Sequence, residues 1–543
     1  MTGRPIGLGL TALLVWLVVY PIAIVFVESV GGPGRWTLEY LRGFVTQSHE
    51  WRALWSSIWI SLASVVLAGC IGIPLGFFFE RVDFRGKRIL GALIALPVVL
   101  PPLVGVLAFL FLFGESGFVA RAVQAVLGLS NSPWRLQGAP AILLVHAYSM
   151  YVYFYLFTRA GLAKVDASMI EAAQSLGCTG FQVIRRVTLP LLRPQIAAAA
   201  LLTFMTSLGS FSAPYVFGGG FRVMTTQIVT SKLNGDTGAA MAETVALASI
   251  AFVGLLLLQR FGGRRSVAAV GKGTTVAAAS LRPATSWMIG AIGWLCAVVL
   301  LLPHLTLLLV SLVPFGTWTT QLVPPEYTLG NYAQLVQEPE RLRPLANSLL
   351  MAGAAALGAV GVALWAGRAI VQRRARLGRA IENLLNVPWA VPGTVLAIAL
   401  STAFSANAPH VLRFVLVGTV FLLPLAYLIR NIPITSGPIV AGFRQLDPSL
   451  EEAATSLGAS RLRVMRRITM PLLRPALLAG GALAYATAVG DFVTSIVLYT
   501  FDTRPISIEI LSALRDFDVG VAAAYGVILM LVSAAAMAIG TSR

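Results

Sequence analysis

Apolar segments long enough to cross a membrane recur along the whole chain, and they limit what it can fold into. Hydrophobic residues make up 57% of the 543 positions and charged residues only 11%, with a mean hydropathy of +0.82. A membrane-spanning helix needs roughly 20 apolar residues. We therefore predict an all-α membrane protein of about twelve spans, placed near 6–28, 55–79, 89–113, 140–158, 194–217, 241–259, 286–311, 345–367, 386–404, 411–429, 475–497 and 520–540.

One stretch between these segments occurs twice. Residues 171–194 read EAAQSLGCTGFQVIRRVTLPLLRP and residues 452–475 read EAATSLGASRLRVMRRITMPLLRP, an offset of 281 positions. Self-similarity over such a distance indicates an internal duplication. With six spans in each copy, the two repeats share one orientation and are related by a pseudo-twofold axis along the membrane normal. We expect a translocation path at that axis.

Each copy of the stretch predicts a short capped helix. Ser168 stands three residues before Glu171 and Ser449 three before Glu452, which is the spacing of a capping box. Gly177 and Gly458 are placed to end these helices in a left-handed conformation. So short a helix needs a packing partner. It could be a linker lying on its own protein, but two copies at matching positions favour a paired docking site.

Basic residues fix the predicted orientation. If the N-terminus is cytoplasmic, 28 of the 40 Lys and Arg residues fall in cytoplasmic segments, as the positive-inside rule requires. Both duplicated stretches and the C-terminus are then cytoplasmic too. The same asymmetry explains the net charge of +18 without nucleic acid as a partner. Residues 6–28 are too long for the apolar core of a signal peptide, so we expect an uncleaved first span.

These patterns divide the chain into two repeats and a linker. The first repeat is residues 1–259 with its loop at 166–194, and the second is 286–543 with its loop at 447–475. The basic segment 260–285 reads as a cytoplasmic linker. It resembles a phosphate-binding loop only superficially, because Ser266 and Gly273 stand where that motif needs Gly and Ser or Thr. We therefore expect no nucleotide site in this chain.

Residues for catalysis or metal binding are sparse. Three cysteines and four histidines are scattered, with no HExxH pair, so we predict no cofactor or metal site. An intramembrane enzyme, the rival class, would need a serine and a base facing each other on two spans, and no such pair is evident. Four tyrosines crowd one span, and phenolates bind ferric iron well. Their spacing spreads them around the helix, which favours packing instead (Tyr148, Tyr151, Tyr153 and Tyr155).

A cytoplasmic Glu-Ala-Ala loop with a following glycine and Pro-Leu-Leu-Arg-Pro resembles the permease subunits of binding-protein-dependent ABC importers. The resemblance covers both halves and implies the type I importer fold in a bacterial inner membrane. It also implies two copies of a cytoplasmic ATPase subunit, which bind the ATP, and a periplasmic binding protein. By this resemblance the loops are coupling helices for the ATPase, formed by Glu171, Ala172, Ala173, Gly177, Glu452, Ala453, Ala454 and Gly458.

A fused chain of twelve spans is similar to the ferric-iron and thiamine branches of these permeases. The segments LPPLVGVLAFLFLFGESG (100–117) and VTSIVLYTFDTRPISIEI (493–510) look most like the ferric-iron permeases. Ferric iron is therefore the expected solute and thiamine the next. Polyamine and phosphonate importers share the loop as well, usually on separate chains.

Two positions are candidates for the translocation path. Ser210 aligns with Asp491 by the 281-residue offset, and each lies at a polar kink late in the fifth span of its repeat. A carboxylate inside a membrane is costly and by default indicates a functional site or a partner. Asp491 could be a transient contact for a cationic substrate. Alternatively, it could pair with an arginine or cap a backbone N–H group near the outer end.

Overall fold

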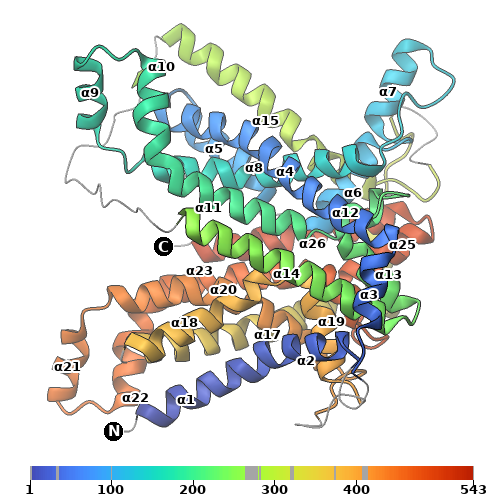
Figure 1. Cartoon of the computed structure of the whole chain (residues 1–543). Coiled ribbons are helices and arrows are strands. Elements are labelled where there is room, and N and C mark those ends of the chain that lie inside the picture. The colour runs from blue at the N-terminus through green and yellow to red at the C-terminus, as the bar shows by residue number, and fades with distance from the viewer. Residues whose placement is uncertain are drawn as a thin grey trace.

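The computed structural model describes residues 3–31, 36–98, 101–262, 279–280, 283–317, 323–371, 375–406 and 414–541. Within these ranges the chain is a bundle of long helices in two halves, one above the other in Figure 1. The predicted linker, 260–285, lies mostly outside the described residues. Its Ala279–Ser280 forms strand β2, which pairs in parallel with β1, Val82–Asp83.

The first half contains fourteen α-helices, whose long members follow the apolar segments. In chain order the helical elements are α1 (Gly3–Leu14), η1 (Val15–Val19), α2 (Tyr20–Ser29), α3 (Glu39–Thr46), α4 (Ser48–Arg81), α5 (Lys87–Ala95), η2 (Leu96–Val98), α6 (Pro102–Phe113), α7 (Phe118–Leu127), α8 (Gly138–Leu162), α9 (Ala167–Ser175), α10 (Gly180–Val183), η3 (Ile184–Thr188), α11 (Leu189–Leu208), α12 (Ser212–Phe217), α13 (Met224–Leu233) and α14 (Thr237–Gly262).

The second half repeats this order from α3 onward, except that its described residues contain no counterpart of α7. Its helical elements are α15 (Pro283–Ser311), α16 (Gly330–Gln337), α17 (Pro339–Val371), α18 (Ala375–Ala390), α19 (Gly393–Ala403), α20 (Leu422–Gln445), α21 (Pro448–Ser456), α22 (Arg461–Val464), η4 (Met465–Thr469), α23 (Met470–Val489), α24 (Val493–Leu498), α25 (Ile506–Arg515) and α26 (Val519–Thr541). From α9 and α21 to α12 and α24 the bounds differ by 281 residues at both ends of every element, as the duplication predicts.

The described residues contain ten helices long and apolar enough to cross a membrane, and one bent pair adds an eleventh span. This confirms the all-α membrane fold. Two predicted spans are interrupted. Segment 89–113 breaks between α5 and α6, and segment 386–404 bends by 106° between α18 and α19. Prolines at both breaks explain the interruptions, because proline lacks an N–H donor and disfavours helical backbone in the residue before it.

The predicted span at 411–429 is misplaced. Apolar residues 414–421 precede the helix, and α20 instead runs from Leu422 to Gln445. It is long enough to span, yet Arg430, Asn431 and two internal prolines lower its hydropathy, and it is not among the ten apolar helices. The prediction from hydropathy therefore included the apolar loop before α20 and left out the polar second part of that helix.

The first helices of the two halves are exchanged. Leu10 and Leu14 of α1 are fully buried in a cluster with Ala366, Ile381 and Leu385 of the second half. Helix α2 packs on α19 of the second half as well as on α14, and α15 packs on α5 and α6 of the first half as well as on α26. Figure 1 shows α1 along the lower, orange half and α15 along the upper, blue half. Each half thus completes its packing with the other's first helix.

Candidate functional site

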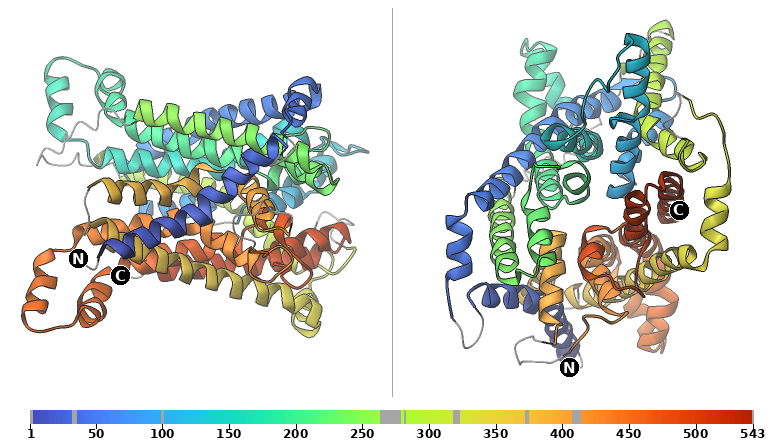
Figure 2. Two further views of the ribbon diagram at one scale, coloured as in Figure 1. Left: turned by 60° about the horizontal axis from the view of Figure 1, so that its bottom comes forward. Right: turned by 90° about the vertical axis from the view of Figure 1, so that its right-hand side faces the viewer.

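Helices α9 and α21 stand away from the bundle at the same end of the molecule (Figure 1). The left view of Figure 2 places both marked chain ends there as well. Each helix is capped by the aspartate before it. Asp166 Oδ1 accepts the Ser168 N–H at 3.0 Å, and Asp447 Oδ1 accepts the Ser449 N–H at 3.0 Å. Hydrogen bonds from Ser449 hold the pKa of Asp447 below its usual value.

The predicted capping boxes at Ser168 and Ser449 are therefore wrong. Both serines lie inside the first helical turn, because each helix begins one residue after an aspartate in extended conformation. Aspartate and serine are comparable caps, so the spacing alone did not decide between them. A complete capping box does occur in the first repeat at the start of the next helix, α10, between Thr179 and Gln182.

Both helices end in a left-handed glycine, as predicted. Gly177 has φ +82° and Gly458 has φ +81°. In the first repeat the Cys178 N–H bonds the Ala173 carbonyl at 3.1 Å and the Gly177 N–H bonds the Gln174 carbonyl at 2.9 Å. The second repeat has the same pair of bonds. This is the Schellman motif, which satisfies the last carbonyls of a helix.

The chain re-enters the bundle through a widened turn. In both repeats a π turn, η3 or η4, joins the short helix α10 or α22 to the long helix that follows. The long helices α11 and α23 begin with the Pro-Leu-Leu-Arg-Pro sequence. Because Pro190 and Pro471 have no N–H, a regular turn would lose its hydrogen bond there and clash with the carbonyl four residues earlier. The π turn thus sets the angle of the loop.

The surface of these loops is apolar at matching positions. Leu176 is 86% exposed and Leu457 is 89% exposed. Phe181 is 73% exposed and Leu462, its equivalent, is 74% exposed. Among the predicted coupling residues, Glu171, Ala172, Glu452 and Ala453 are exposed, Ala173 is buried and Ala454 is half-buried. Exposed apolar side chains clustered on a projecting helix indicate a contact surface for another protein.

Helix α21 is tied to the bundle by one acidic residue outside the exposed surface. Glu451 Oε1 lies 3.6 Å from Arg368 Nη1 of α17 and accepts the Thr469 hydroxyl at 2.6 Å. Glu452, its neighbour, points to the exposed side. Glu451 therefore links α21 to α17 and to the end of η4, immediately before α23.

The other two predicted residues, Ser210 and Asp491, lie where the halves meet. Gly209, beside Ser210, lies against Pro392 of the second half, and Gly490, beside Asp491, lies against Pro101 of the first. The rings of Phe211 and Phe492, also one residue away, have centroids 5.5 Å apart. Phe211 is 1% exposed and Phe492 is 2% exposed, so side chains close the axis at this level.

In the first half the axis is flanked by a neutral polar network. His146 of α8 is buried, with Nε2 2.9 Å from Ser210 Oγ. Its Nδ1 lies 2.9 Å from Ser64 Oγ and 3.1 Å from Ser207 Oγ. The Thr225 hydroxyl donates to the Ser210 carbonyl at 2.7 Å. The network therefore satisfies the buried histidine without a counter-charge.

In the second half the corresponding place holds an ion pair. Asp491 is 8% exposed, and its Oδ2 lies 3.0 Å from Arg430 Nη1 of α20. Asp491 Oδ1 accepts the Thr494 N–H at 2.8 Å, so the carboxylate both pairs with an arginine and caps a backbone donor. The Ser507 hydroxyl donates to the Asp491 carbonyl at 2.8 Å, as Thr225 does to Ser210. A role for Asp491 in transport stays a prediction.

Sequence reasoning missed His146, Arg430, Phe211 and Phe492 as parts of this region. The offset of 281 residues that paired Ser210 with Asp491 also pairs the two phenylalanines. Arg430 is an arginine inside a helix long enough to span, which is itself a signal. The four tyrosines of α8 lie elsewhere. Tyr151, for example, donates to the Ile94 carbonyl at 2.7 Å and packs in a core cluster.

Two parallel repeats, each with a projecting loop helix at the same end and a shared closed axis, define the membrane subunit of a transporter. The model of the family "binding-protein-dependent transport system inner membrane component" matches residues 72–267 and again 359–541. The chain therefore belongs to this family, the permease subunits of ABC importers, as a fused pair of permease domains.

Several characterised or named permeases are similar over most of the chain. The probable ABC transporter permease protein y4fN of Sinorhizobium fredii is 30% identical over 491 residues, covering 90% of this chain and 86% of the relative. The ferric transport system permease protein FbpB of Actinobacillus pleuropneumoniae is 28% identical, covering 97% and 76%. The thiamine transport system permease protein ThiP of Escherichia coli is 28% identical, covering 82% and 80%. The chain is thus a multi-pass inner-membrane subunit that works with an ATPase partner.

Proposed function

We propose that this permease carries ferric iron into the cytoplasm. It would take iron from a periplasmic binding protein and be driven by two copies of an ATPase subunit that bind and hydrolyse the ATP. The support for iron is the similarity to a ferric transport permease over 97% of this chain, whereas the thiamine permease is similar over 82%. Thiamine, and more remotely polyamine or phosphonate, are the competing solutes.

The observation that carries the coupling role is the matched pair of exposed loop helices. The end bearing α9 and α21 would face the cytoplasm, together with both chain ends. There Glu171, Ala172, Ala173 and Gly177 would form one docking helix, and Glu452, Ala453, Ala454 and Gly458 the other. The exposed Leu176 and Leu457 would enter a groove on each ATPase subunit. A glutamate at the tip offers a partner for a basic residue there.

ATP would drive transport by favouring one arrangement of the two helices. Closure of the ATPase pair would draw α9 and α21 together, and α11 and α23 would transmit this motion to Ser210 and Asp491 at their far ends. The contact of Phe211 with Phe492 would then open. ATP shifts the equilibrium only by its difference in affinity for the two states.

The test is uptake by the complete importer in proteoliposomes, with the ATPase and the binding protein encoded beside it. We expect ATP-dependent accumulation of radioactive ferric iron and none of labelled thiamine. Accumulation of thiamine or a polyamine would remove the iron assignment and leave the permease intact. If Leu176→Asp with Leu457→Asp left both ATPase association and uptake unchanged, the docking assignment would fail.

A further inference from the structure

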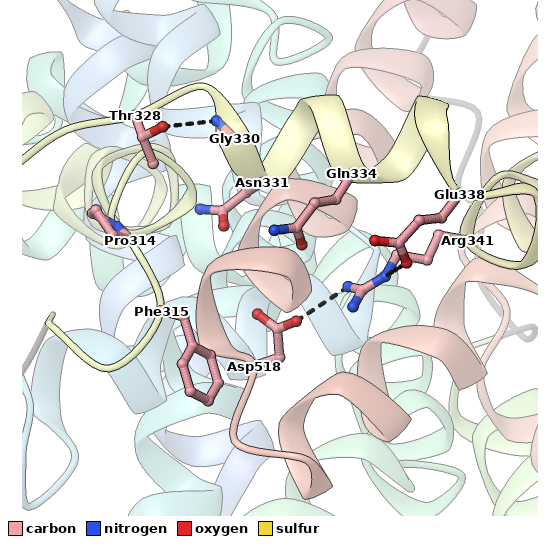
Figure 3. Close-up of a pocket in the computed structure, with 9 residues that line it drawn as sticks. All are labelled: Pro314, Phe315, Thr328, Gly330, Asn331, Gln334, Glu338, Arg341 and Asp518. Atoms are coloured by element: carbon pink, nitrogen blue, oxygen red, sulfur yellow. Dashed lines mark hydrogen bonds and ion pairs between the residues drawn. The ribbon is translucent and has the colours of Figure 1, made fainter.

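A polar cavity of about 360 Å³ lies in the second half, between α16, the start of α17 and the start of α26. Arg341 is about 40 Å of helix away from Arg368, which contacts α21, so the cavity is at the end opposite α21. Figure 3 shows Asn331 and Gln334 of α16 above Asp518, with Phe315 at one side and Arg341 at the other. On the proposed function, this end faces the periplasm.

The cavity arises from differences between the repeats. In the first half, Tyr40 of α3 lies so close to α14 that a Cβ at Gly238 would be 2.0 Å from its ring. The equivalent residues of the second half are Asn331 and Gly520, and here the smaller Asn331 donates to the Ser311 and Val313 carbonyls. Loss of the tyrosine ring leaves the space open.

The residues that line the cavity carry one net negative charge. Arg341 donates to Glu338 Oε2 at 2.6 Å and to Asp518 Oδ2 at 3.1 Å, so two carboxylates face one guanidinium. The described residues of the segments that supply the cavity lining, 312–317, 323–344 and 499–519, include seven carboxylates and four arginines. Those of the corresponding segments of the first half, 29–31, 36–53 and 217–237, include three carboxylates and four basic residues. The two halves therefore present opposite formal charge at this end.

An exposed aromatic residue stands at the edge of the cavity in a strained conformation. Phe517 has φ +58° and is 79% exposed. Its equivalent in the first half is Gly235, with φ +82°. A side chain in the left-handed region is unfavourable for any residue but glycine, asparagine or aspartate. Because the ring is mostly exposed, packing within this chain compensates little for that strain. Phe315, another exposed aromatic, lines the cavity.

We infer that this surface is where one lobe of the solute-binding protein docks, with a lysine or arginine side chain of that lobe entering the cavity next to the ion-pair cluster of Glu338, Arg341 and Asp518, which carries one net negative charge. The inference rests on the proposed function and adds which lobe of the binding protein lies over which half of the permease. The lobe over the second half is basic at its contact, and the lobe over the first half is acidic there. Exposed aromatic rings at Phe315 and Phe517 provide the apolar anchors that such contacts use. The opposite charges allow a single orientation of the two-lobed partner.

The experiment compares two glutamine-to-lysine changes on α16. Gln334→Lys places a cation inside the cavity, whereas Gln337→Lys, the control, adds the same charge to the exposed helix outside it. The reconstituted importer's ATPase rate is measured against the concentration of the binding protein encoded beside it. We expect Gln334→Lys to raise the half-maximal concentration about tenfold, and Gln337→Lys less than about threefold. Equal effects, or none, would overturn the inference.

Two measurements separate this inference from the proposed function. The basal ATPase rate without binding protein should be unchanged in both variants. If the binding protein failed to stimulate ATP hydrolysis by the unmodified importer at any concentration, the permease role itself would be contradicted instead. Phe517→Gly restores the residue type of the first half. It should leave thermal stability unchanged or raise it while weakening stimulation by the binding protein. Unchanged stimulation by Phe517→Gly would remove the ring from the docking surface.

The charge of the cavity can be tested without the partner. In a chain with its three native cysteines replaced, Gln334→Cys should react faster with a trimethylammonium thiosulfonate than with a sulfonate one, by about tenfold. Gln337→Cys corrects for the intrinsic difference between the reagents. A ratio no greater at position 334 than at 337 would show that the cavity does not favour cations, and the inference would fail.

Discussion

Gly177 and Gly458 are constrained by backbone conformation and not by space. A Cβ at either position would meet no atom within 4 Å, yet both have φ above +80°. Any side chain there costs about 1–2 kcal/mol in the left-handed region. Gly180, three residues after Gly177 and the first residue of α10, has equal room and no left-handed φ. Comparing Gly177 and Gly458 with Gly180 therefore separates the effect of backbone conformation from the effect of side-chain size.

Changing the left-handed glycines should uncouple transport. We expect the double change of Gly177 and Gly458 to leucine to abolish ATP-driven uptake, because the Schellman ends unwind and misplace the docking helices. Membrane level should be unchanged. Gly180→Leu, which adds the same side chain at a permissive φ, should retain most of the uptake. Normal uptake in the double variant, measured at matched protein level, would remove these glycines from the coupling role.

The aspartate caps give a second test at this scale. Asp447→Ala should destabilise α21, because the N-cap hydrogen bond is lost, whereas Ser449→Ala should cost little. Because the pKa of Asp447 is depressed, its cap contributes fully above the unfolded value near 3.9 and is lost as pH falls through the folded value. Amide hydrogen exchange along 447–458 measures both. Faster exchange in the serine variant than in the aspartate variant would contradict this assignment.

At the scale of elements, two equivalent contacts join the halves at the axis, and one is closer than the other. A Cβ at Gly490 would lie 2.6 Å from the Pro101 side chain, while one at Gly209 would lie 3.7 Å from Pro392. We expect Gly490→Ala to disturb the closed axis and raise the basal ATPase rate at least about twofold, and Gly209→Ala to change it little. The two single variants, assayed side by side in the reconstituted importer, decide this. A larger effect at Gly209 would contradict it.

The ion pair between Asp491 and Arg430 separates a transport role from a structural one. Asp491→Asn leaves the arginine without its counter-charge, and breaking a buried pair costs several kcal/mol. We expect uptake to fall about tenfold or more, with the ATPase still co-purifying. The double change Asp491→Asn with Arg430→Met removes both charges. Uptake restored in the double variant would show that the pair only maintains structure, whereas continued loss supports a place on the path.

Some elements were predictable from the sequence and others were not, for physical reasons. The loop helices were found because their glycines and prolines require specific backbone conformations wherever they occur. Helix α20 was misplaced because Arg430 and Asn431 are satisfied by neighbouring helices, by Thr494 and Asp491 in the case of the arginine. Hydropathy does not register such partners. The Asp491 pairing was open beforehand because the sequence does not reveal which of many arginines lies opposite.

At the scale of the whole molecule, the exchanged first helices join the halves independently of the linker. Cutting the chain after residue 270 into two co-expressed pieces should therefore still give a complex, because α1 and α2 pack on the second half and α15 on the first. A tag on one piece should retrieve the other from detergent extracts, and uptake should be retained. Deleting residues 1–31 from the first piece should reduce retrieval at matched expression. Intact halves that never co-purify would disprove this.

The duplication and the membrane class were predictable at this scale, and the exchange was not. Repeats and hydropathy are properties of segments, whereas partner choice between equally apolar helices depends on fit. Leu10 and Leu14 would satisfy an apolar pattern against either half. The same limit applies to the cavity beside Arg341. It exists because Asn331 replaces the tyrosine ring that fills the corresponding contact between α3 and α14 in the first half.

The exchange also sets an order of events during synthesis. Helix α1 leaves the ribosome first, but α17 and α18, which cover it, begin more than 320 residues later. At ordinary translation speeds this is a delay of roughly 15 to 75 s. Throughout that interval Leu10 and Leu14 face lipid or the insertion machinery, and the amino-terminal half cannot mature alone. Because both halves are on one polypeptide, α17 and α18 are always made in the same number as α1 and close to it.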